Sequence, residues 1–303
     1  MADLQVKFAG ITLPNPVLAA SGAYGFGREF AKLYPLSLPG AIMAKGLTLA
    51  PSAGNPLPRI AETPSGMLNS IGLENPGVDG FIAEELPWLI TQGARVIANI
   101  SGNTPDEFEE ISRRLSETEG LTAVEVNVSC PNLDQGGMFF GTDPLLTAEV
   151  TRAVKKYCRV PLLVKLTPNV TDITEIAKAA ASEGADGLSL INTLLGMAID
   201  VKTRRPVIAR QIAGLSGPAV KPVALRMVWQ VAQATDLPVV GMGGIVSAED
   251  AIEFLLAGAT AVAVGSGNLV NPYCIPEIID GIHHWLDREG YASVSEIRGL
   301  ALP

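Results

Sequence analysis

The sequence predicts an α/β protein, a (β/α)8 TIM barrel with a short N-terminal β-hairpin and long insertions in its βα loops. Two observations lead to this fold. Short apolar runs alternate with longer helical patterns along the chain, which is typical of a parallel sheet. Eight such repeats in about 290 residues favour closure of the sheet into a barrel. With 48% hydrophobic and only 17% charged residues, the chain is expected to form one well-buried domain over residues 1–303.

The expected strands are short apolar runs, and a small hairpin is expected in front of them in LQVKFAGITL. The runs are Pro16–Ala20, Ala41–Ala44, Arg95–Ile100, Ala123–Val126, Pro161–Lys165, Gly187–Ile191, Pro238–Val240 and Ala261–Val264. Two connections, Gly46–Pro76 and Thr193–Gly217, are too long for simple loops. Connections of that length in a compact domain usually have a function or form an interface. Their apolar parts, such as Gly46–Pro58 and Leu194–Ile199, are therefore candidate contact surfaces.

Helices are expected between the strands because several helix starts are recognisable. Thr104, Pro105 and Glu107 are typical of an N-cap, a proline at the first helical position and a capping-box glutamate. The cap pattern recurs at three later positions: Asp143-Pro144 before a stretch that ends at Tyr157, Asp172 with Glu175, and Ser247 with Asp250.

Composition excludes several classes of function. A formal net charge of −9 without any basic run argues against nucleic-acid binding. No signal peptide is expected at MADLQVKFAG, and no apolar run reaches the roughly 18–20 residues of a membrane span. Cys130, Cys158 and Cys274 are far apart, so neither a disulfide framework nor a metal or iron–sulfur site is expected in this chain. A reducing cytoplasm is the expected compartment.

Polar residues and glycines follow nearly every expected strand, at the end where α/β barrels have their active sites. They are Ser21, Lys45-Gly46, Asn99, Asn127 with Cys130, Lys165, Asn192-Thr193, Gly243-Gly244 and Gly265-Ser266. Polar strand ends are common in any fold, but a lysine directly after an apolar run, as in IMAK and LLVK, is not. A buried lysine needs an anionic partner. We therefore expect functional roles for Lys45 and Lys165.

Glycine-rich turns follow the last two strands, in GMGGI and AVAVGSG. Barrels bind phosphate at this place with backbone N–H groups and a helix N-terminus. Val246 occupies the last position of a would-be GxGxxG, so a Rossmann dinucleotide site is not supported. The ligand must also reach a group of asparagines, Asn69, Asn99, Asn127, Asn132 and Asn192. FMN fits both requirements, with Lys165 near the N1–O2 edge of its ring.

Cys130 stands on a loop just past the fourth strand, in EVNVSCPN. A thiol there is suited to act as a general base, because its ordinary pKa near 8.5 allows proton removal near neutral pH. The following PNLDQGGMFFGTD is consistent with a lid over the site. Lone cysteines are more often inert buried thiols, which is our interpretation of Cys158 and Cys274.

At this point the sequence resembles dihydroorotate dehydrogenase, and within that family the class 1B catalytic subunit, over essentially the whole chain. The most specific stretches are NSIGLENPG, EVNVSCPN with GGMFFGTD, VKLTPN, INTLLGMAID, TRRP, GLSGPAVKPVALRMV and GMGGI. The QGG lid and TRRP…GLSGPA look more like class 1B than like the fumarate-using class 1A. The membrane-bound class has serine in place of the catalytic cysteine and an N-terminal helix, and this chain shows neither.

The resemblance implies an FMN-containing oxidoreductase that converts (S)-dihydroorotate to orotate in pyrimidine (UMP) biosynthesis. Cys130 would take the proton from C5 while hydride passes from C6 to flavin N5. The residues implied to hold FMN are Ser21, Lys45, Gly46, Asn99, Asn127, Lys165, Ile191, Gly217, Gly243, Gly244, Gly265 and Ser266. Those implied to hold substrate are Lys45, Asn69, Ser70, Ile71, Gly72, Leu73, Asn127, Asn132, Asn192 and Thr193.

The resemblance also implies a partner. Electrons would leave to NAD+ through an iron–sulfur subunit that holds FAD and a [2Fe-2S] centre, in a heterotetramer of two catalytic and two electron-transfer subunits.

Three other functions remain open on the residues alone. An FMN-dependent dihydropyrimidine or dihydrouridine reductase would use the same cysteine, and an assay of dihydroorotate against dihydrouracil would distinguish it. A phosphosugar isomerase or lyase that uses a lysine would be colourless when purified. A non-catalytic flavin-binding subunit would be yellow but would not be bleached by dihydroorotate.

Overall fold

A closed parallel barrel forms the centre of the protein in the computed structural model, which describes residues 1–129 and 140–303. In these residues the barrel has eight strands, in the spatial order β10-β15-β16-β3-β4-β7-β8-β9. They are β3 (Val17–Ala19), β4 (Ile42–Met43), β7 (Val96–Ile100), β8 (Leu121–Asn127), β9 (Leu162–Lys165), β10 (Gly187–Leu190), β15 (Val239–Met242) and β16 (Ala261–Val264). Each expected run contains or overlaps one of these strands, so the predicted (β/α)8 fold is confirmed.

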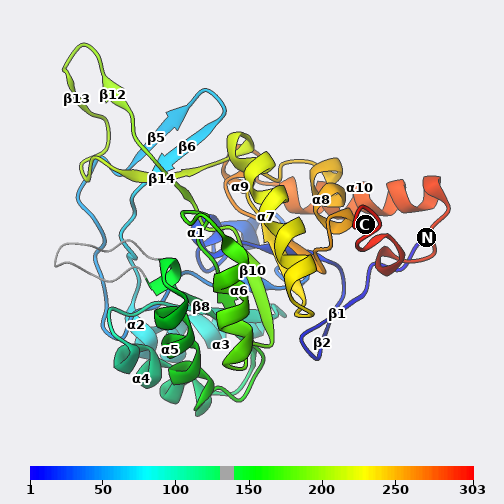
Figure 1. The fold of residues 1–303 in the computed structure, drawn as a ribbon, viewed down its shortest axis with the longest axis horizontal. Coiled ribbons are helices and arrows are strands. Elements are labelled where there is room, and N and C mark those ends of the chain that lie inside the picture. The colour runs from blue at the N-terminus through cyan, green and yellow to red at the C-terminus, as the bar shows by residue number, and fades with distance from the viewer. Residues whose placement is uncertain (130–139) are drawn as a thin grey trace.

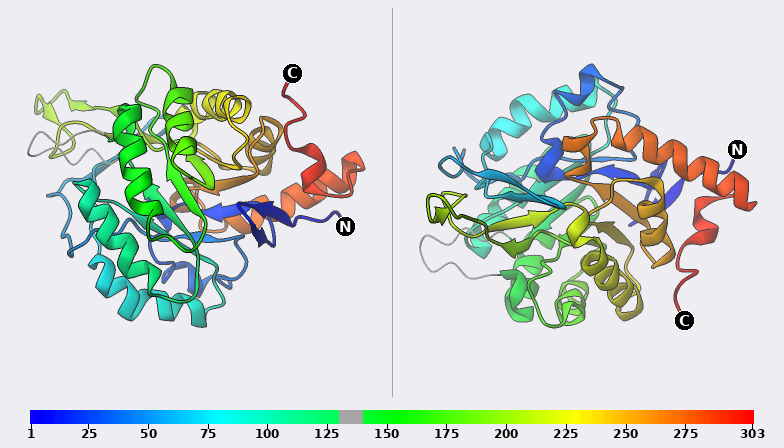
Figure 2. Two further views of the ribbon diagram at one scale, coloured as in Figure 1. Left: turned by 60° about the horizontal axis from the view of Figure 1, so that its bottom comes forward. Right: turned by 90° about the horizontal axis from the view of Figure 1, so that it is seen from above.

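Helices surround the barrel on its outside (Figures 1 and 2). They are α1 (Ser21–Tyr24), α2 (Gly77–Gly80), α3 (Leu86–Thr91), α4 (Pro105–Ser116), α5 (Pro144–Lys155), α6 (Ile173–Ser182), α7 (Lys221–Ala234), α8 (Ala248–Leu256), α9 (Gly267–Val270) and α10 (Cys274–Glu289). The strands are covered on both faces, which explains why they are continuous apolar runs in the sequence. None of the helices in the described residues is long and apolar enough to cross a membrane.

The expected caps Thr104, Asp143, Asp172 and Ser247 all accept hydrogen bonds from their helices, but the pairing of Asp172 with Glu175 is not found, because Asp172 accepts from the N–H of Thr174. Thr104 caps α4 by accepting a hydrogen bond from the Glu107 N–H at 3.2 Å, and Pro105 is its first residue. The carboxylate of Glu107 accepts from the N–H of Asn103 at 2.7 Å rather than from Thr104, so the predicted capping box at α4 is wrong. The box at Ser247 and Asp250 is confirmed.

The predicted hairpin is present as β1 (Val6–Phe8) and β2 (Ile11–Leu13), which pair antiparallel. Phe8 is fully buried and lies against Gly187, where a side chain would come within 3.1 Å of its ring. Because Gly187 is the first residue of β10, the hairpin packs at the amino-terminal end of that strand, opposite the expected site.

The two long connections pair with each other, which the sequence did not indicate. The first contains β5 (Ile60–Thr63) and β6 (Gly66–Asn69), and the second contains β11 (Leu194–Gly196) and β14 (Ala213–Ser216). Together they form an antiparallel sheet in the order β11-β14-β6-β5. A further hairpin, β12 (Ile199–Asp200) with β13 (Arg205–Pro206), follows β11. We call this four-stranded sheet together with the hairpin the arm, and the hairpin points away from the labelled chain ends (Figure 1).

Candidate functional site

The carboxyl ends of three neighbouring barrel strands bring together polar residues that the sequence analysis selected. Asn99 lies near the end of β7, Asn127 ends β8 and Lys165 ends β9. Asn127 is the register partner of Lys165. Asn192, which follows β10, donates from Nδ2 to the Oδ1 of Asn127 at 3.2 Å. Four adjacent strands therefore share one polar wall at the mouth of the barrel.

Two lysine ammonium groups at this end of the barrel have no protein acceptor within hydrogen-bonding distance among the described residues. The side chain of Lys165 is only 7% exposed, and the one carboxylate oxygen within 4.0 Å of its Nζ is Oε2 of Glu125, at 3.9 Å. Lys45 is partly buried two residues after the end of β4, and no ion pair forms between it and the rest of the described chain. Both cations are thus available to an anionic ligand.

The glycine turn after β15 packs backbone against backbone. Gly244 has φ +79°, and a Cβ there would lie 2.8 Å from the carbonyl oxygen of Gly217 and 2.9 Å from the N atom of Lys221. Gly243 has φ +124°, and a Cβ there would lie 3.2 Å from a side-chain carbon of Ile191. Only glycine suits these positive φ angles and close approaches. The structure therefore brings together four residues expected to hold the cofactor.

The ends of the first and last barrel strands lie side by side. Ala20 donates from its N–H to the carbonyl oxygen of Val264 at 2.9 Å, and a Cβ at Gly265 would lie 3.8 Å from that of Ala20. Ser21 begins α1 and is buried, while Ser266 precedes α9. Because β10, β15, β16 and β3 are consecutive in the barrel, the residues expected to hold the cofactor after these strands, from Ile191 to Ser21, follow one another around the mouth.

The predicted substrate loop, Asn69 to Leu73, extends from β6 toward the same mouth. A Cβ on Gly46 would lie 3.0 Å from the Cδ2 of Leu73 and 2.9 Å from the Oδ1 of Asn99, so the loop reaches the ends of β4 and β7. Ser70 is held by Asn55, which donates from Nδ2 to its Oγ at 2.8 Å. Thr193 lies against Gly214 of β14. Gly214 is also the register partner of Asn69, so the loop is held by residues of both long connections.

Comparison with known proteins identifies the family at this point. A family model described as "Dihydroorotate dehydrogenase" matches residues 3–286. The chain belongs to the dihydroorotate dehydrogenase family. Among its curated relatives, a protein of Anoxybacillus flavithermus is 54% identical over 299 residues, which cover 99% of this chain and 96% of that protein. A protein of Geotalea uraniireducens is 54% identical over 300 residues, 99% of this chain and 98% of that protein.

A third relative, from Bacillus pumilus, is 53% identical over 296 residues, 98% of this chain and 96% of that protein. All three are named dihydroorotate dehydrogenase B (NAD+), catalytic subunit. The predicted resemblance to class 1B and the predicted enzyme class, an oxidoreductase, are thereby confirmed. The words "catalytic subunit" imply that those dihydroorotate dehydrogenases work with another subunit.

The sequence analysis missed two buried residues that organise the site. Asn75 donates from Nδ2 to the Oγ1 of Thr48 at 2.8 Å and to the carbonyl oxygen of Leu73 at 2.6 Å, which ties the substrate loop to the chain after β4. Glu125 is fully buried inside β8 and contacts side chains from β7, β9 and β10. Its signal in the sequence was one acid within an apolar run.

The predicted catalytic Cys130 and the predicted substrate residue Asn132 lie outside the described residues. The other two cysteines are described. Burial raises the pKa of the Cys158 thiol, and burial, with Glu277 and Asp250 nearby, raises the pKa of the Cys274 thiol to about 11. A thiol with a raised pKa is rarely ionised near neutral pH, which favours the interpretation of both as packing residues.

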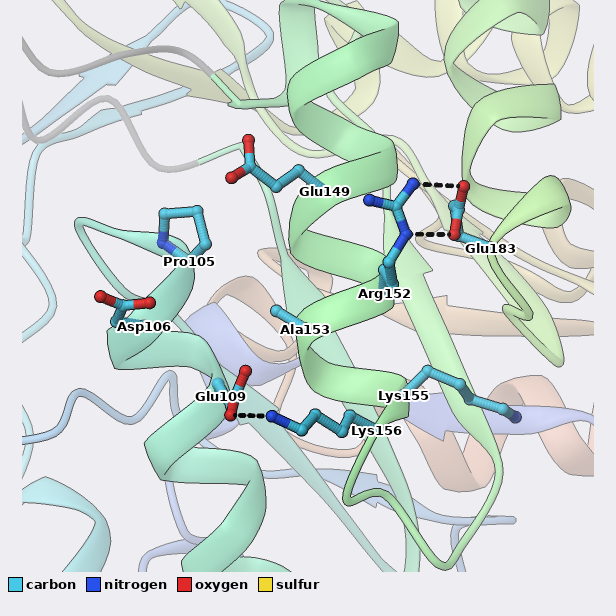
Figure 3. A pocket seen from close by; sticks show the side chains of 9 residues that line it. All are labelled: Pro105, Asp106, Glu109, Glu149, Arg152, Ala153, Lys155, Lys156 and Glu183. Carbon is cyan, nitrogen blue, oxygen red and sulfur yellow. Dashed lines mark hydrogen bonds and ion pairs between the residues drawn. The ribbon is translucent and has the colours of Figure 1, made fainter.

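A polar pocket on the outer layer lies apart from these strand ends, between α4 and α5 (Figure 3). The cations that line it are paired with acids of the protein: Arg152 with Glu183, Lys155 with Asp186 and Lys156 with Glu109, each at 2.7 Å. Within the described part of the chain, no three histidine, cysteine or acidic side chains gather as a metal site would require. The polar wall and the glycine turns at the barrel mouth remain the candidate active site.

Proposed function

We propose that this member of the dihydroorotate dehydrogenase family oxidises (S)-dihydroorotate to orotate, in pyrimidine biosynthesis, with FMN as its cofactor. The observation that carries the proposal is the pair of ammonium groups of Lys45 and Lys165. Both lie at the carboxyl end of the barrel, and neither hydrogen-bonds to an acceptor among the described residues. They suit a site that takes a carboxylate substrate and a cofactor whose ring gains negative charge.

The residues at the barrel mouth fit FMN. A Cβ would collide with Ala224 at Gly243 and with Gly217 and Lys221 at Gly244, so both positions keep a bare backbone, which suits the close approach of a phosphate. Flavin dependence is general in this family and supports the same conclusion. The proposed FMN-holding residues are Ser21, Lys45, Gly46, Asn99, Asn127, Lys165, Ile191, Gly217, Gly243, Gly244, Gly265 and Ser266. When bound, FMN supplies the acceptor for the hydride that leaves C6 of dihydroorotate.

The chain's own residues bind the substrate and move its proton. Lys45 is suited to the substrate carboxylate, and the asparagine amides supply both donors and acceptors for the amide groups of the ring. The proposed substrate-holding residues are Lys45, Asn69, Ser70, Ile71, Gly72, Leu73, Asn127, Asn132, Asn192 and Thr193. Cys130 is the proposed base that removes the C5 proton.

An anaerobic flavin spectrum tests the proposal. The purified chain is expected to be yellow, to release FMN on denaturation, and to lose its flavin absorbance when dihydroorotate is added. Dihydrouracil should leave the absorbance unchanged. A colourless protein, or a yellow one that dihydroorotate does not bleach, would contradict the proposal.

We further propose that electrons leave this chain through a second subunit that holds FAD and a [2Fe-2S] centre and reduces NAD+, in a heterotetramer of two subunits of each kind. The names of the relatives support a separate subunit and NAD+. Apolar side chains on the arm support a protein contact, since Met197, Ile199 and Val201 are exposed and Val201 is 84% exposed.

A further inference from the structure

Glu125 places a carboxylate inside the barrel, below the mouth. It lies on β8 two residues before Asn127, so both side chains are on the same face of the strand. Glu125 is fully buried. Its Oε1 accepts from the Oγ of Ser189 at 2.5 Å, and its Oε2 accepts from the Nδ2 of Asn99. Side chains from β7 and β10 thus meet on one acid of β8.

Lys165 is the one cation within 4.0 Å of this carboxylate among the described residues. A buried carboxylate is costly unless a charge or hydrogen bonds compensate it, and here both are present. The separation of 3.9 Å between Nζ of Lys165 and Oε2 of Glu125 is too long for a hydrogen bond. Glu125 therefore attracts the ammonium without using its three N–H donors, which remain for a ligand.

Glu125 also decides which atom Asn99 presents to the site. A carboxylate only accepts hydrogen bonds, so the amide group turned toward it must be the NH2 of Asn99. The Oδ1 of Asn99 is consequently turned to Gly46, where a Cβ would lie 2.9 Å from it. The wall thus offers an acceptor from Asn99 beside the donors of Lys165.

We propose that Glu125 is a positioning residue of the flavin site, which fixes the Asn99 amide and the Lys165 ammonium and lowers the reduction potential of the bound flavin. The inference rests on the proposed function, because it takes FMN as the ligand of Asn99 and Lys165. The effect on potential follows from charge. A reduced flavin carries more negative charge than an oxidised one, so the nearby carboxylate disfavours reduction and offsets part of the effect of Lys165.

Glu125→Gln separates charge from shape, because glutamine keeps the length and one acceptor oxygen. We expect the ratio of reduced to oxidised flavin at a fixed solution potential to rise about tenfold, a shift of about +30 mV for a two-electron couple. The affinity of the FMN-free protein for oxidised FMN should stay close to that of wild type. The matched control is Glu149→Gln, which removes the same charge from an exposed position on α5 and should leave the potential unchanged. An unchanged potential in Glu125→Gln, or an equal shift in both variants, would overturn the proposal.

Glu125→Asp makes the opposite separation, since it keeps the charge and shortens the side chain by one methylene. Its carboxylate is drawn back from Asn99 and Lys165, so FMN is expected to bind about tenfold more weakly, as for a lost hydrogen bond. The potential of the flavin that does bind should stay near that of wild type. Wild-type FMN affinity in Glu125→Asp would overturn the positioning role. This variant alone tests that role if Glu125→Gln does not fold.

The wild-type protein distinguishes this inference from the proposed function. If wild type binds no FMN, or if dihydroorotate does not bleach it, the proposed function fails and the inference fails with it. If wild type is bleached but the Glu125 variants match it in potential and FMN affinity, only the inference fails.

Discussion

Asn192 donates a hydrogen bond from Nδ2 to the Oδ1 of Asn127 at 3.2 Å, which joins the loop after β10 to the end of β8 across the end of β9. The same Oδ1 accepts from the N–H of Ser129 at 3.1 Å. Both bonds use the oxygen of the Asn127 amide. Its NH2 group makes no hydrogen bond within the part of the chain that the structure describes, so its donors are available to a ligand at the barrel mouth.

Asn127→Ala should therefore weaken substrate binding and slow flavin reduction. It removes the free donors and leaves the Asn192 amide and the Ser129 N–H without their acceptor. We expect kcat/KM for dihydroorotate to fall roughly tenfold to a hundredfold. Asn127→Asp is the matched control, because it keeps an oxygen for both bonds but sets a negative charge against the anionic substrate. It should unfold at the temperature of wild type and still bind dihydroorotate weakly. Wild-type kcat/KM in Asn127→Ala would contradict this role.

Lys165 and Glu125 should be coupled in stability as well as in position. Lys165→Met leaves the buried Glu125 carboxylate without its cation, and breaking a buried pair in this way costs about 3 kcal/mol. The double variant Lys165→Met/Glu125→Gln removes both charges and should recover most of that loss. Urea unfolding of the FMN-free single and double variants measures both changes. If the two substitutions are simply additive, the charges are not coupled.

Lys221 and Asp250 hold the start of α7 beside the glycine turn. The Nζ of Lys221 lies 2.6 Å from the Oδ1 of Asp250, and Oδ2 accepts from the N–H groups of Val246 and Ser247. Burial alone would raise the pKa of Asp250, but the bonds from Lys221 and from the backbone outweigh it and hold the pKa below its ordinary value near 3.8. An acid with a lowered pKa in the folded state stabilises the fold above its unfolded pKa, and this contribution is lost as the pH falls.

Asp250→Asn should consequently lower the free energy of unfolding at pH 7 by about 2 kcal/mol, since it removes a charge-assisted hydrogen bond and weakens the cap of α8. The difference from wild type should shrink as the pH falls below about 4, where the wild-type acid becomes protonated as well. Glu253→Gln is the control, because Glu253 pairs with the same lysine at 3.0 Å through a side chain that is 44% exposed. It should cost less than about 1 kcal/mol. A loss in Asp250→Asn that does not depend on pH would show that the cap alone matters.

Cys130→Ala should keep FMN but lose flavin reduction by dihydroorotate. Removal of a positioned base costs about 10²–10⁴-fold in rate, which stopped-flow measurement of flavin bleaching would show. Cys130→Ser should recover activity only at high pH, because a hydroxyl is a far weaker base than a thiol. Cys158→Ala is the matched control, since burial raises the pKa of that thiol, and it should reduce its flavin at the wild-type rate. Near-normal reduction in Cys130→Ala would exclude Cys130 as the base.

The barrel could be predicted from the sequence because its strands are covered on both faces. All four residues of β9, Leu162–Lys165, are buried, so the strand stands out as an apolar run that ends in lysine. The sheet of the arm gave no such signal. Its strand β6 is mostly half-buried, and it pairs with β14 through Asn69 and Gly214, which are 145 residues apart. Local periodicity carries no information about a pairing of that range.

The candidate site was likewise predictable only in part: its residues could be named from the sequence, but their contacts could not. Residues at strand ends could be named one by one, because the carboxyl ends of parallel strands meet at the same mouth. The partners of Glu125 could not be named, since Asn99, Ser189 and Lys165 belong to three other strands and the sequence gives no register between them. The start of α4 shows the same limit, because the carboxylate of Glu107 accepts from the N–H of Asn103 and not from the expected N–H of Thr104.

The isolated chain should transfer electrons to NAD+ poorly. It has no GxGxxG fingerprint for a dinucleotide, because Val246 stands where the last glycine of that pattern would be, and its three cysteines are too few for an iron–sulfur cluster. NADH formation from dihydroorotate should therefore be slow with this chain alone and fast after addition of an FAD- and [2Fe-2S]-containing subunit.

A change on the arm tests where that second protein binds. Val201→Lys sets a charge on an exposed apolar position of the arm, in the turn between β12 and β13. If the arm contacts the second subunit, this variant should still be bleached by dihydroorotate at the wild-type rate but should form less NADH in the mixture, because a buried unpaired charge weakens an interface. Thr203→Lys, at an exposed polar position of the same arm, is the control and should match wild type both in bleaching and in NADH formation. For the isolated chain, equal NAD+-dependent turnover with and without the added subunit would refute the need for a partner. Rapid turnover with fumarate would instead place the chain in class 1A, since fumarate would then accept the electrons directly.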